Sequence, residues 1–144
     1  MQQTRKQVVL DANIVISAII KPRGTASRAL EKAMRGSSII EPPRFGVELI
    51  EFASRLEIGK KRALDPNRIS ELLKTMARNE IIKFVDPAKK HYLCRDERDN
   101  DFIDLAIEYN AVLLSGDTDI LSLKETLLSY DVRVLSPREF LEEA

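Results

Sequence analysis

The stretch VVLDANIVISAII, residues 8–20, places one acidic side chain, Asp11, within an otherwise apolar run. Its first three residues are typical of a short buried strand, and the isoleucine-rich segment after Asn13 indicates further buried chain. A carboxylate in apolar surroundings costs free energy unless it is paired, hydrogen-bonded or bound to a cation. Asp11 is therefore expected to have a specific partner.

The composition limits the class of protein. The chain has 144 residues, which suits a single domain spanning 1–144. Lys and Arg together number 23, as do Asp and Glu, so bulk charge alone does not hold this protein on nucleic acid. One cysteine, Cys94, excludes an internal disulfide and is typical of a reducing compartment. No long apolar run or signal-peptide pattern occurs, which predicts a cytoplasmic protein without a membrane span.

Short β-branched segments alternate with helical patterns along the chain. Strands are expected at 8–10, 38–40, 81–86, 111–117 and 132–137. Helices are expected at 24–37, 45–56, 69–76, 101–110, 120–130 and 136–144. The last helix begins with a capping box made by Ser136 and Glu139, with Pro137 at the first helical position. This alternation predicts a parallel sheet covered by helices on both faces.

Acidic residues follow two of the predicted strands. Asp11 comes directly after the first strand, and Asp117 and Asp119 come at the end of the fourth. Ligands of parallel sheets bind beyond the carboxyl ends of the strands, where the strand order reverses. If both strands are central, these side chains can converge on one crevice. Several converging carboxylates require a cation, and oxygen ligands of this kind select Mg²⁺ or Mn²⁺.

Helical spacing selects two further acids. Asp99 precedes Ile103 by four residues and Ala106 by seven, so it shares their inward-facing stripe. Glu48 borders the apolar face of its predicted helix. Each acid also has an ordinary structural interpretation: a helix cap for Asp99, a turn for Asp117, and a solvated position for Glu48. The metal-site hypothesis depends on the acids taken together.

The order and spacing of these motifs resemble the PIN domain family, most of all its stand-alone prokaryotic toxins related to VapC-type ribonucleases. The resemblance runs from about Val8 to Leu141. It implies a three-layer α/β/α sandwich with a central parallel sheet of about five strands. The segments that carry it are Asp11-Ala12-Asn13, Glu48, Arg95-Asp96-Glu97-Arg98-Asp99-Asn100 and Ser115-Gly116-Asp117-Thr118-Asp119.

The same resemblance implies an endoribonuclease in which one or two Mg²⁺ or Mn²⁺ ions activate the water that attacks the phosphodiester bond. The catalytic and metal-binding acids would be Asp11, Glu48, Asp99 and Asp117. The supporting residues would be Asn13, Ser115, Asp96 and Asp119. The RNA phosphates would be held by Lys21, Arg23 and Arg95. The densest basic run, Lys60 to Arg62, is expected to be a solvated face.

The implied partners are an RNA substrate, a second copy of the chain in a homodimer, and a small antitoxin protein that covers the crevice. Two other functions stay open. One is a catalytically silent RNA-binding or assembly module of the same fold. The other is a phosphatase of the haloacid-dehalogenase type, which needs a second acid where this chain has Asn13.

Overall fold

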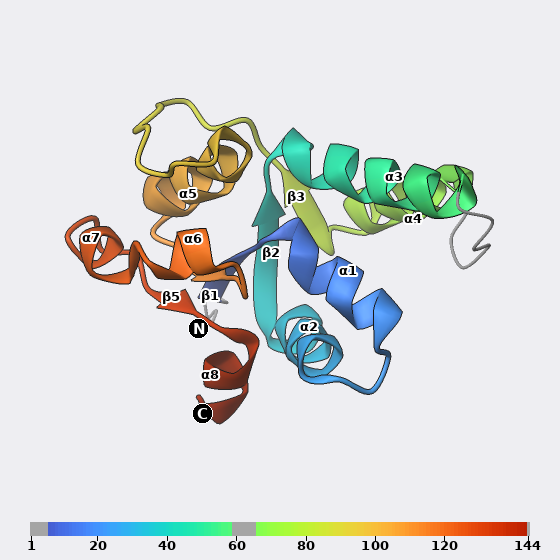
Figure 1. Cartoon of the computed structure of the whole chain (residues 1–144), viewed down its shortest axis with the longest axis horizontal. Helices are drawn as coiled ribbons and strands as arrows, with labels where there is room; N and C mark the ends of the chain where they lie inside the picture. The colour runs from blue at the N-terminus through green and yellow to red at the C-terminus, as the bar shows by residue number, and fades with distance from the viewer. Residues whose placement is uncertain (1–5, 59–65, 144) are drawn as a thin grey trace.

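The computed structural model describes residues 6–58 and 66–143 (Figure 1). In these ranges one all-parallel sheet has the strand order β3-β2-β1-β4-β5 and is flanked by helices, which confirms the predicted α/β/α sandwich. The basic run from Lys60 to Arg62 lies outside the described residues. The strands are β1 (Lys6–Leu10), β2 (Ser37–Glu41), β3 (Ile82–Phe84), β4 (Val112–Leu114) and β5 (Val134–Leu135).

Helices connect the strands and cover the sheet. They are α1 (Ala12–Ile20), α2 (Thr25–Gly36), α3 (Pro43–Ile58), α4 (Pro66–Arg78), α5 (Glu97–Tyr109), α6 (Thr118–Leu121), α7 (Lys124–Leu128) and α8 (Pro137–Glu142). The capping box predicted for α8 is present, because Ser136 and Glu139 bond each other's backbone N–H groups reciprocally. Across the described ranges, none of the helices combines the length and apolar character needed to cross a membrane.

Three expectations about helices were wrong in detail. The helix expected over 120–130 is divided into α6 and α7, because Leu123 leaves the helical conformation with φ −93° and ψ 9°. Helix α5 begins at Glu97, earlier than expected, because the Asp96 side chain caps it by accepting the N–H of Arg98. Ile20, expected to be buried, is 60% exposed at the last turn of α1.

The carboxyl ends of the adjacent strands β1 and β4 lie side by side at one edge of the sheet. β1 and β4 are buried throughout their apolar residues, and their register pairs Leu10 with Leu114. Asp11 and Ser115 are therefore the next residues of two neighbouring parallel strands. The chain passes outward from β1 to β2 and β3, then returns to β4 on the other side, so the strand order reverses between β1 and β4. This is the edge at which such sheets bind ligands.

Candidate metal centre

Asp11 ends β1 and forms the N-cap of α1. Its Oδ1 accepts the backbone N–H of Asn13 at 3.1 Å, and its Oδ2 accepts the hydroxyl of Ser115 at 2.9 Å. The residue is only 1% exposed, and burial raises the pKa of its carboxyl above the ordinary value although these hydrogen bonds oppose the rise. Both carboxylate oxygens are thus held in fixed directions at the end of the strand.

Ser115 connects Asp11 to Asp117. The Ser115 hydroxyl donates to Asp11 and also accepts the backbone N–H of Asp117 at 3.0 Å. Asp117 in turn caps the short helix α6, because its Oδ1 accepts the N–H of Asp119 at 2.8 Å. The segment after β4 therefore turns so that Asp117 lies beside the end of β1.

Asp99 reaches the same place from α5. It lies in the first turn of that helix on the face of Ile103 and Ala106, and it is 5% exposed. Burial, followed by the nearby charges of Asp117 and Asp11, raises the pKa of Asp99 to about 7. The apolar side of α5 therefore carries one carboxyl into the acidic edge of the sheet.

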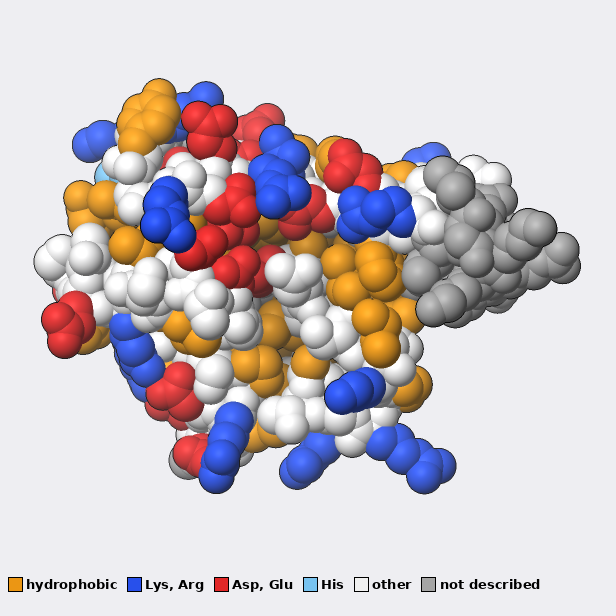
Figure 2. All heavy atoms as spheres, viewed as in Figure 1, with side chains coloured by type: hydrophobic (Ala, Val, Ile, Leu, Met, Phe, Trp, Pro, Cys, Tyr) orange, Lys and Arg blue, Asp and Glu red, His pale blue; other side chains and the backbone are white. Residues whose placement is uncertain are grey.

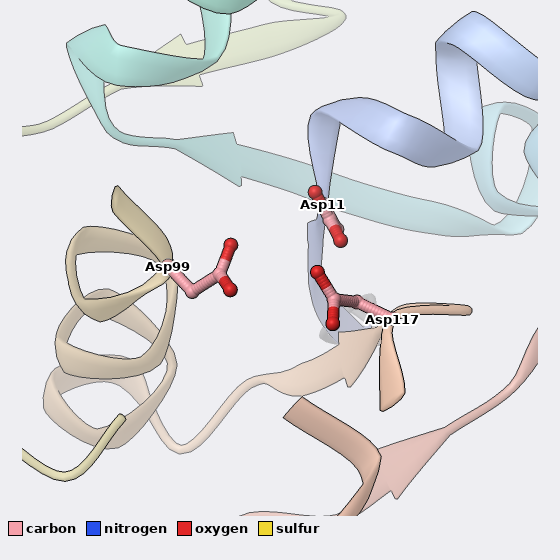
Figure 3. A group of neighbouring side chains, drawn as sticks. All are labelled: Asp11, Asp99 and Asp117. Carbon is pink, nitrogen blue, oxygen red and sulfur yellow. The ribbon is translucent and has the colours of Figure 1, made fainter. Parts of the chain in front are cut away.

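The three aspartates point toward one another in Figure 3. One carboxylate oxygen from each of Asp11, Asp99 and Asp117 can be chosen so that all lie within 4.8 Å of one another. A second group, made by Asp96, Asp99 and Asp119, meets the same criterion and shares Asp99. Within 6–58 and 66–143, none of the first three makes an ion pair with a basic side chain. Three carboxylates at this spacing, without a basic side chain paired to them, fit a divalent cation such as Mg²⁺ or Mn²⁺.

Glu48 lies at the wall of the same site. With Asp99 and Asp117 it lines a hollow of about 180 Å³, but it is not a member of either close group of carboxylates. Burial, followed by the charge of Asp11, raises the pKa of Glu48 to about 7. The structure therefore places three of the four predicted acids, Glu48, Asp99 and Asp117, around one hollow. Asp11 adjoins them through its close approach to Asp99 and Asp117. Asn13 also lines the hollow.

The three basic residues predicted to hold RNA lie in different places relative to the acids. Lys21 is the C-cap of α1, whereas Asp11 is its N-cap, so a helix of nine residues separates Lys21 and the following Arg23 from the acids. Arg95 lies 3.9 Å from Asp119. Figure 2 shows acidic side chains at the centre of one face, with basic side chains beside them.

Two arginines that the sequence did not single out line the hollow: Arg55 of α3 and Arg98 of α5. Arg98 also pairs with Asp96 at 3.1 Å. A third, Arg44, is close enough to lower the pKa of Glu48. Arg44 and Arg55 lie four residues before and seven residues after Glu48 on the same helix, and this spacing could have revealed them because such residues share a face. Arg98 directly precedes Asp99, so helical spacing gave no such signal for it.

Glu41 is a buried acid that the sequence interpretation missed. It is fully buried at the end of β2, and its Oε2 accepts the backbone N–H of Leu10 at 3.0 Å. Its Oε1 has no hydrogen-bond partner among the described residues. The paired register of β1 and β2 ends at Val8 and Ile39, and Pro42 has no N–H with which to continue it. Burial raises the pKa of Glu41 well above its usual value.

Comparison with known proteins identifies the family and agrees with the fold. The family model of the PIN domain matches residues 7–119. The uncharacterized protein MJ1680 of Methanocaldococcus jannaschii is 30% identical over 153 aligned positions, covering 99% of this chain and 94% of that protein. The crystal structure of VapBC2 from Rickettsia felis, bound to a DNA fragment from its promoter, has a similar fold. It aligns with a TM-score of 0.60 and 17% identity over 90% of this chain and 98% of that one. The chain belongs to the PIN domain family.

Proposed function

We propose that this protein is a cytoplasmic endoribonuclease that depends on Mg²⁺ or Mn²⁺. The observation that supports the proposal is the convergence of Asp11, Asp99 and Asp117 from three segments at the carboxyl edge of the sheet. The PIN domain family consists generally of nucleases. A phosphatase of the haloacid-dehalogenase type is disfavoured because it needs a second acid two residues after Asp11, where this chain has Asn13.

The proposed roles follow from position. Asp11, Asp99 and Asp117 would hold the ion or ions, and Glu48, which lines the same hollow as Asp99 and Asp117, would complete the ligands. A divalent ion held by these residues would supply an activated water and would neutralise charge on the leaving oxygen. Ser115 and Asn13 hold the Asp11 carboxylate in one orientation. The exposed guanidinium groups of Arg95 and Arg98 are donors for RNA phosphates.

The test is cleavage of a mixed pool of single-stranded and structured RNA with Mg²⁺, Mn²⁺ or EDTA. We expect cleavage by the wild type with either metal, none with EDTA, and a loss of at least about a hundredfold in Asp11→Asn and Asp99→Asn. The matched control is Asp101→Asn, which lies two residues from Asp99 on the same helix but belongs to neither group of converging carboxylates. Cleavage that survives EDTA, or full activity of Asp99→Asn, contradicts the proposal.

We further propose that the protein is the toxin of a toxin–antitoxin pair and forms a homodimer. Support comes from its motifs and from the fold it shares with VapBC2. Expression of the wild type in a bacterial host is expected to arrest growth, whereas Asp99→Asn is tolerated at the same protein level. Equal growth of the two strains argues against the toxin role. Sedimentation of the purified chain tests the dimer.

A further inference from the structure

The segment between β3 and α5, residues 85–96, runs back over α5 (Figure 1). Three α5 side chains at intervals of four residues, Asn100, Asp104 and Glu108, accept its backbone N–H groups. The donors are those of Cys94 at 2.9 Å, His91 at 3.1 Å and Ala88 at 2.9 Å, in that order. Residues four apart share one face of a helix. The loop is therefore fastened to α5 once per helical turn.

Two of these attachments are doubled by further contacts. Asn100 also donates from Nδ2 to the carbonyl of Cys94 at 3.2 Å. Asp104, which is 2% exposed, also contacts Nδ1 of His91 at 3.1 Å. The ring of His91 packs edge-on against Tyr130, with the ring centroids 5.4 Å apart. The backbone on either side of Tyr92 is thus fixed before any partner binds.

The fastened loop presents an aromatic ring to solvent. Tyr92 is 77% exposed, the highest value among the exposed large hydrophobic side chains of the described residues. Its φ is 54°, in the left-handed region that bulky residues rarely adopt. Such conformations persist only where the surrounding structure imposes them, and they gather at binding sites. At this exposure the ring contributes little to the core formed by the described residues.

Basic side chains lie on both sides of the ring in the sequence. Lys89 and Lys90 precede Tyr92 and Arg95 follows it, and all three are exposed. Arg95 approaches Asp119 to 3.9 Å, which joins the loop to the second group of converging carboxylates. A cavity of about 420 Å³ lies there, lined by Leu93, Arg95 and Asp119 among others. The loop therefore leads directly to the acidic site.

We propose that residues 89–95 form a preformed platform for single-stranded RNA, in which a base stacks on Tyr92 and the neighbouring phosphates contact Lys89 and Lys90. Proteins that bind single strands combine an aromatic stacking surface with basic side chains along the backbone in this way. The bases of a duplex are stacked on one another and cannot use the ring. The proposal rests on the proposed function, because it assigns the path by which RNA reaches the acids.

The chain contains no tryptophan, so Tyr92→Trp places a single fluorescent reporter on the platform. The matched control is Leu72→Trp, at a residue that is 54% exposed on α4. Both changes are made in Asp11→Asn protein so that bound RNA stays intact. We expect a single-stranded 12-nucleotide RNA to quench the reporter at position 92 and leave the reporter at position 72 unchanged. A blunt RNA duplex is expected to quench neither.

Substitution separates stacking from a structural role. Tyr92→Ala is expected to weaken binding of the single strand about tenfold, and Tyr92→Phe to restore it, because stacking needs the ring and not the hydroxyl. Tyr92→Gly relieves the left-handed backbone, so it should keep or raise the melting temperature while binding falls. If Tyr92 had only a structural role, Tyr92→Gly would lower the melting temperature and leave RNA binding unchanged. Replacing Lys89 and Lys90 by Gln should make the salt dependence of binding shallower by about 1.4 in log–log slope.

The outcomes distinguish the platform from the nuclease. Quenching confined to position 92, with weakened binding in Tyr92→Ala, supports the platform even if the wild type cleaves nothing. Cleavage by Tyr92→Ala with wild-type KM overturns the platform and leaves the nuclease intact. Equal quenching at positions 92 and 72, or equal quenching by duplex, also overturns it. Quenching by a protein partner in place of RNA would assign the loop to an antitoxin contact and overturn the RNA platform.

Discussion

Ser115 joins two of the converging aspartates through one hydroxyl group. It donates to Asp11 Oδ2 and accepts the N–H of Asp117, and it is fully buried. Ser115→Ala removes both contacts and leaves the half-buried N–H of Asp117 without its acceptor, which should lower the free energy of unfolding by about 1–3 kcal/mol. Weaker Mn²⁺ binding should accompany this loss, because Asp11 is no longer held in one orientation. Urea unfolding and calorimetric titration of Mn²⁺ measure the two effects.

Ser115→Thr is the control for that substitution, since it keeps the hydroxyl. It should retain Mn²⁺ affinity close to that of the wild type, even if the extra methyl costs some stability in the packed site. If Ser115→Ala binds Mn²⁺ as tightly as the wild type, the hydroxyl does not position the ligand.

Glu41 gives a prediction about stability and pH. Its folded pKa lies well above the ordinary value of 4.5, because burial favours the neutral carboxyl. The contribution of this neutral carboxyl to the stability of the folded protein is present below about pH 4.5 and is lost as pH rises through the folded pKa. Glu41→Gln keeps an oxygen that accepts from Leu10 and carries no charge. The variant should therefore melt at a higher temperature than the wild type at pH 8, with a smaller difference at pH 4, when both are measured with EDTA.

Glu41→Leu separates the hydrogen bond from the charge. It removes the acceptor of the Leu10 N–H as well as the carboxyl, so it should be less stable than Glu41→Gln by about 1–3 kcal/mol. A Glu41→Gln variant that is less stable than the wild type at pH 8 would show that the ionised carboxylate itself stabilises this edge of the sheet.

Helix α5 carries two stripes of polar side chains, and the sequence revealed only one of them. The spacing of Asp99, Ile103 and Ala106 predicted that an acid lies on the apolar stripe, and the structure places all three on one buried face. The second stripe, from Asn100 to Glu108, binds backbone N–H groups of the preceding loop. Backbone donors leave no trace in a pattern of side chains, so this stripe could not be predicted in that way.

The second stripe of α5 can be tested by removing its central member. Asp104→Ala leaves the N–H of His91 without its acceptor and frees the imidazole ring. Amide hydrogen exchange of residues 88–94 should become faster, and KM for RNA should rise with little change in kcat, because the acids are untouched. Asp104→Asn keeps an acceptor oxygen and is the control. Unchanged exchange in Asp104→Ala would show that the other attachments suffice.

Other elements show the same division between what local patterns reveal and what they do not. The capping box of α8 was predictable because both partners lie within three residues of one another. The role of Glu41 was not, because its partner Leu10 is 31 residues away and the sequence SIIEPP marks only the end of a strand. The separation of α6 from α7 arises at Leu123, an apolar residue that helical periodicity places inside a continuous helix.

The sheet brings the acidic residues together across almost the whole chain. Ser115 bonds to Asp11 over a separation of 104 residues, and it does so because β1 and β4 are adjacent and in register. Folding therefore places buried carboxyls side by side before any ion binds. Four described acids at this edge have a raised pKa: Asp11, Glu41, Glu48 and Asp99. In each case the main cause is burial, which destabilises the charged carboxylate.

This concentration of acids predicts how stability depends on pH and metal. The pKa values of Glu48 and Asp99 are raised to about 7 from 4.5 and 3.8, so without metal their contribution to stability is present below about pH 4 and is lost as pH rises through about 7. A divalent ion favours the charged carboxylates and opposes this loss. The melting temperature with millimolar Mn²⁺ minus that with EDTA should therefore increase from pH 5 to pH 8, as measured by scanning calorimetry.

Asp99→Asn should reduce both the fall in stability with pH and the gain with Mn²⁺, whereas Asp101→Asn should reproduce the wild-type curves. A metal-free protein whose stability rises across this range would contradict the assigned burial of the acids, and a constant difference would contradict binding of the ion by them.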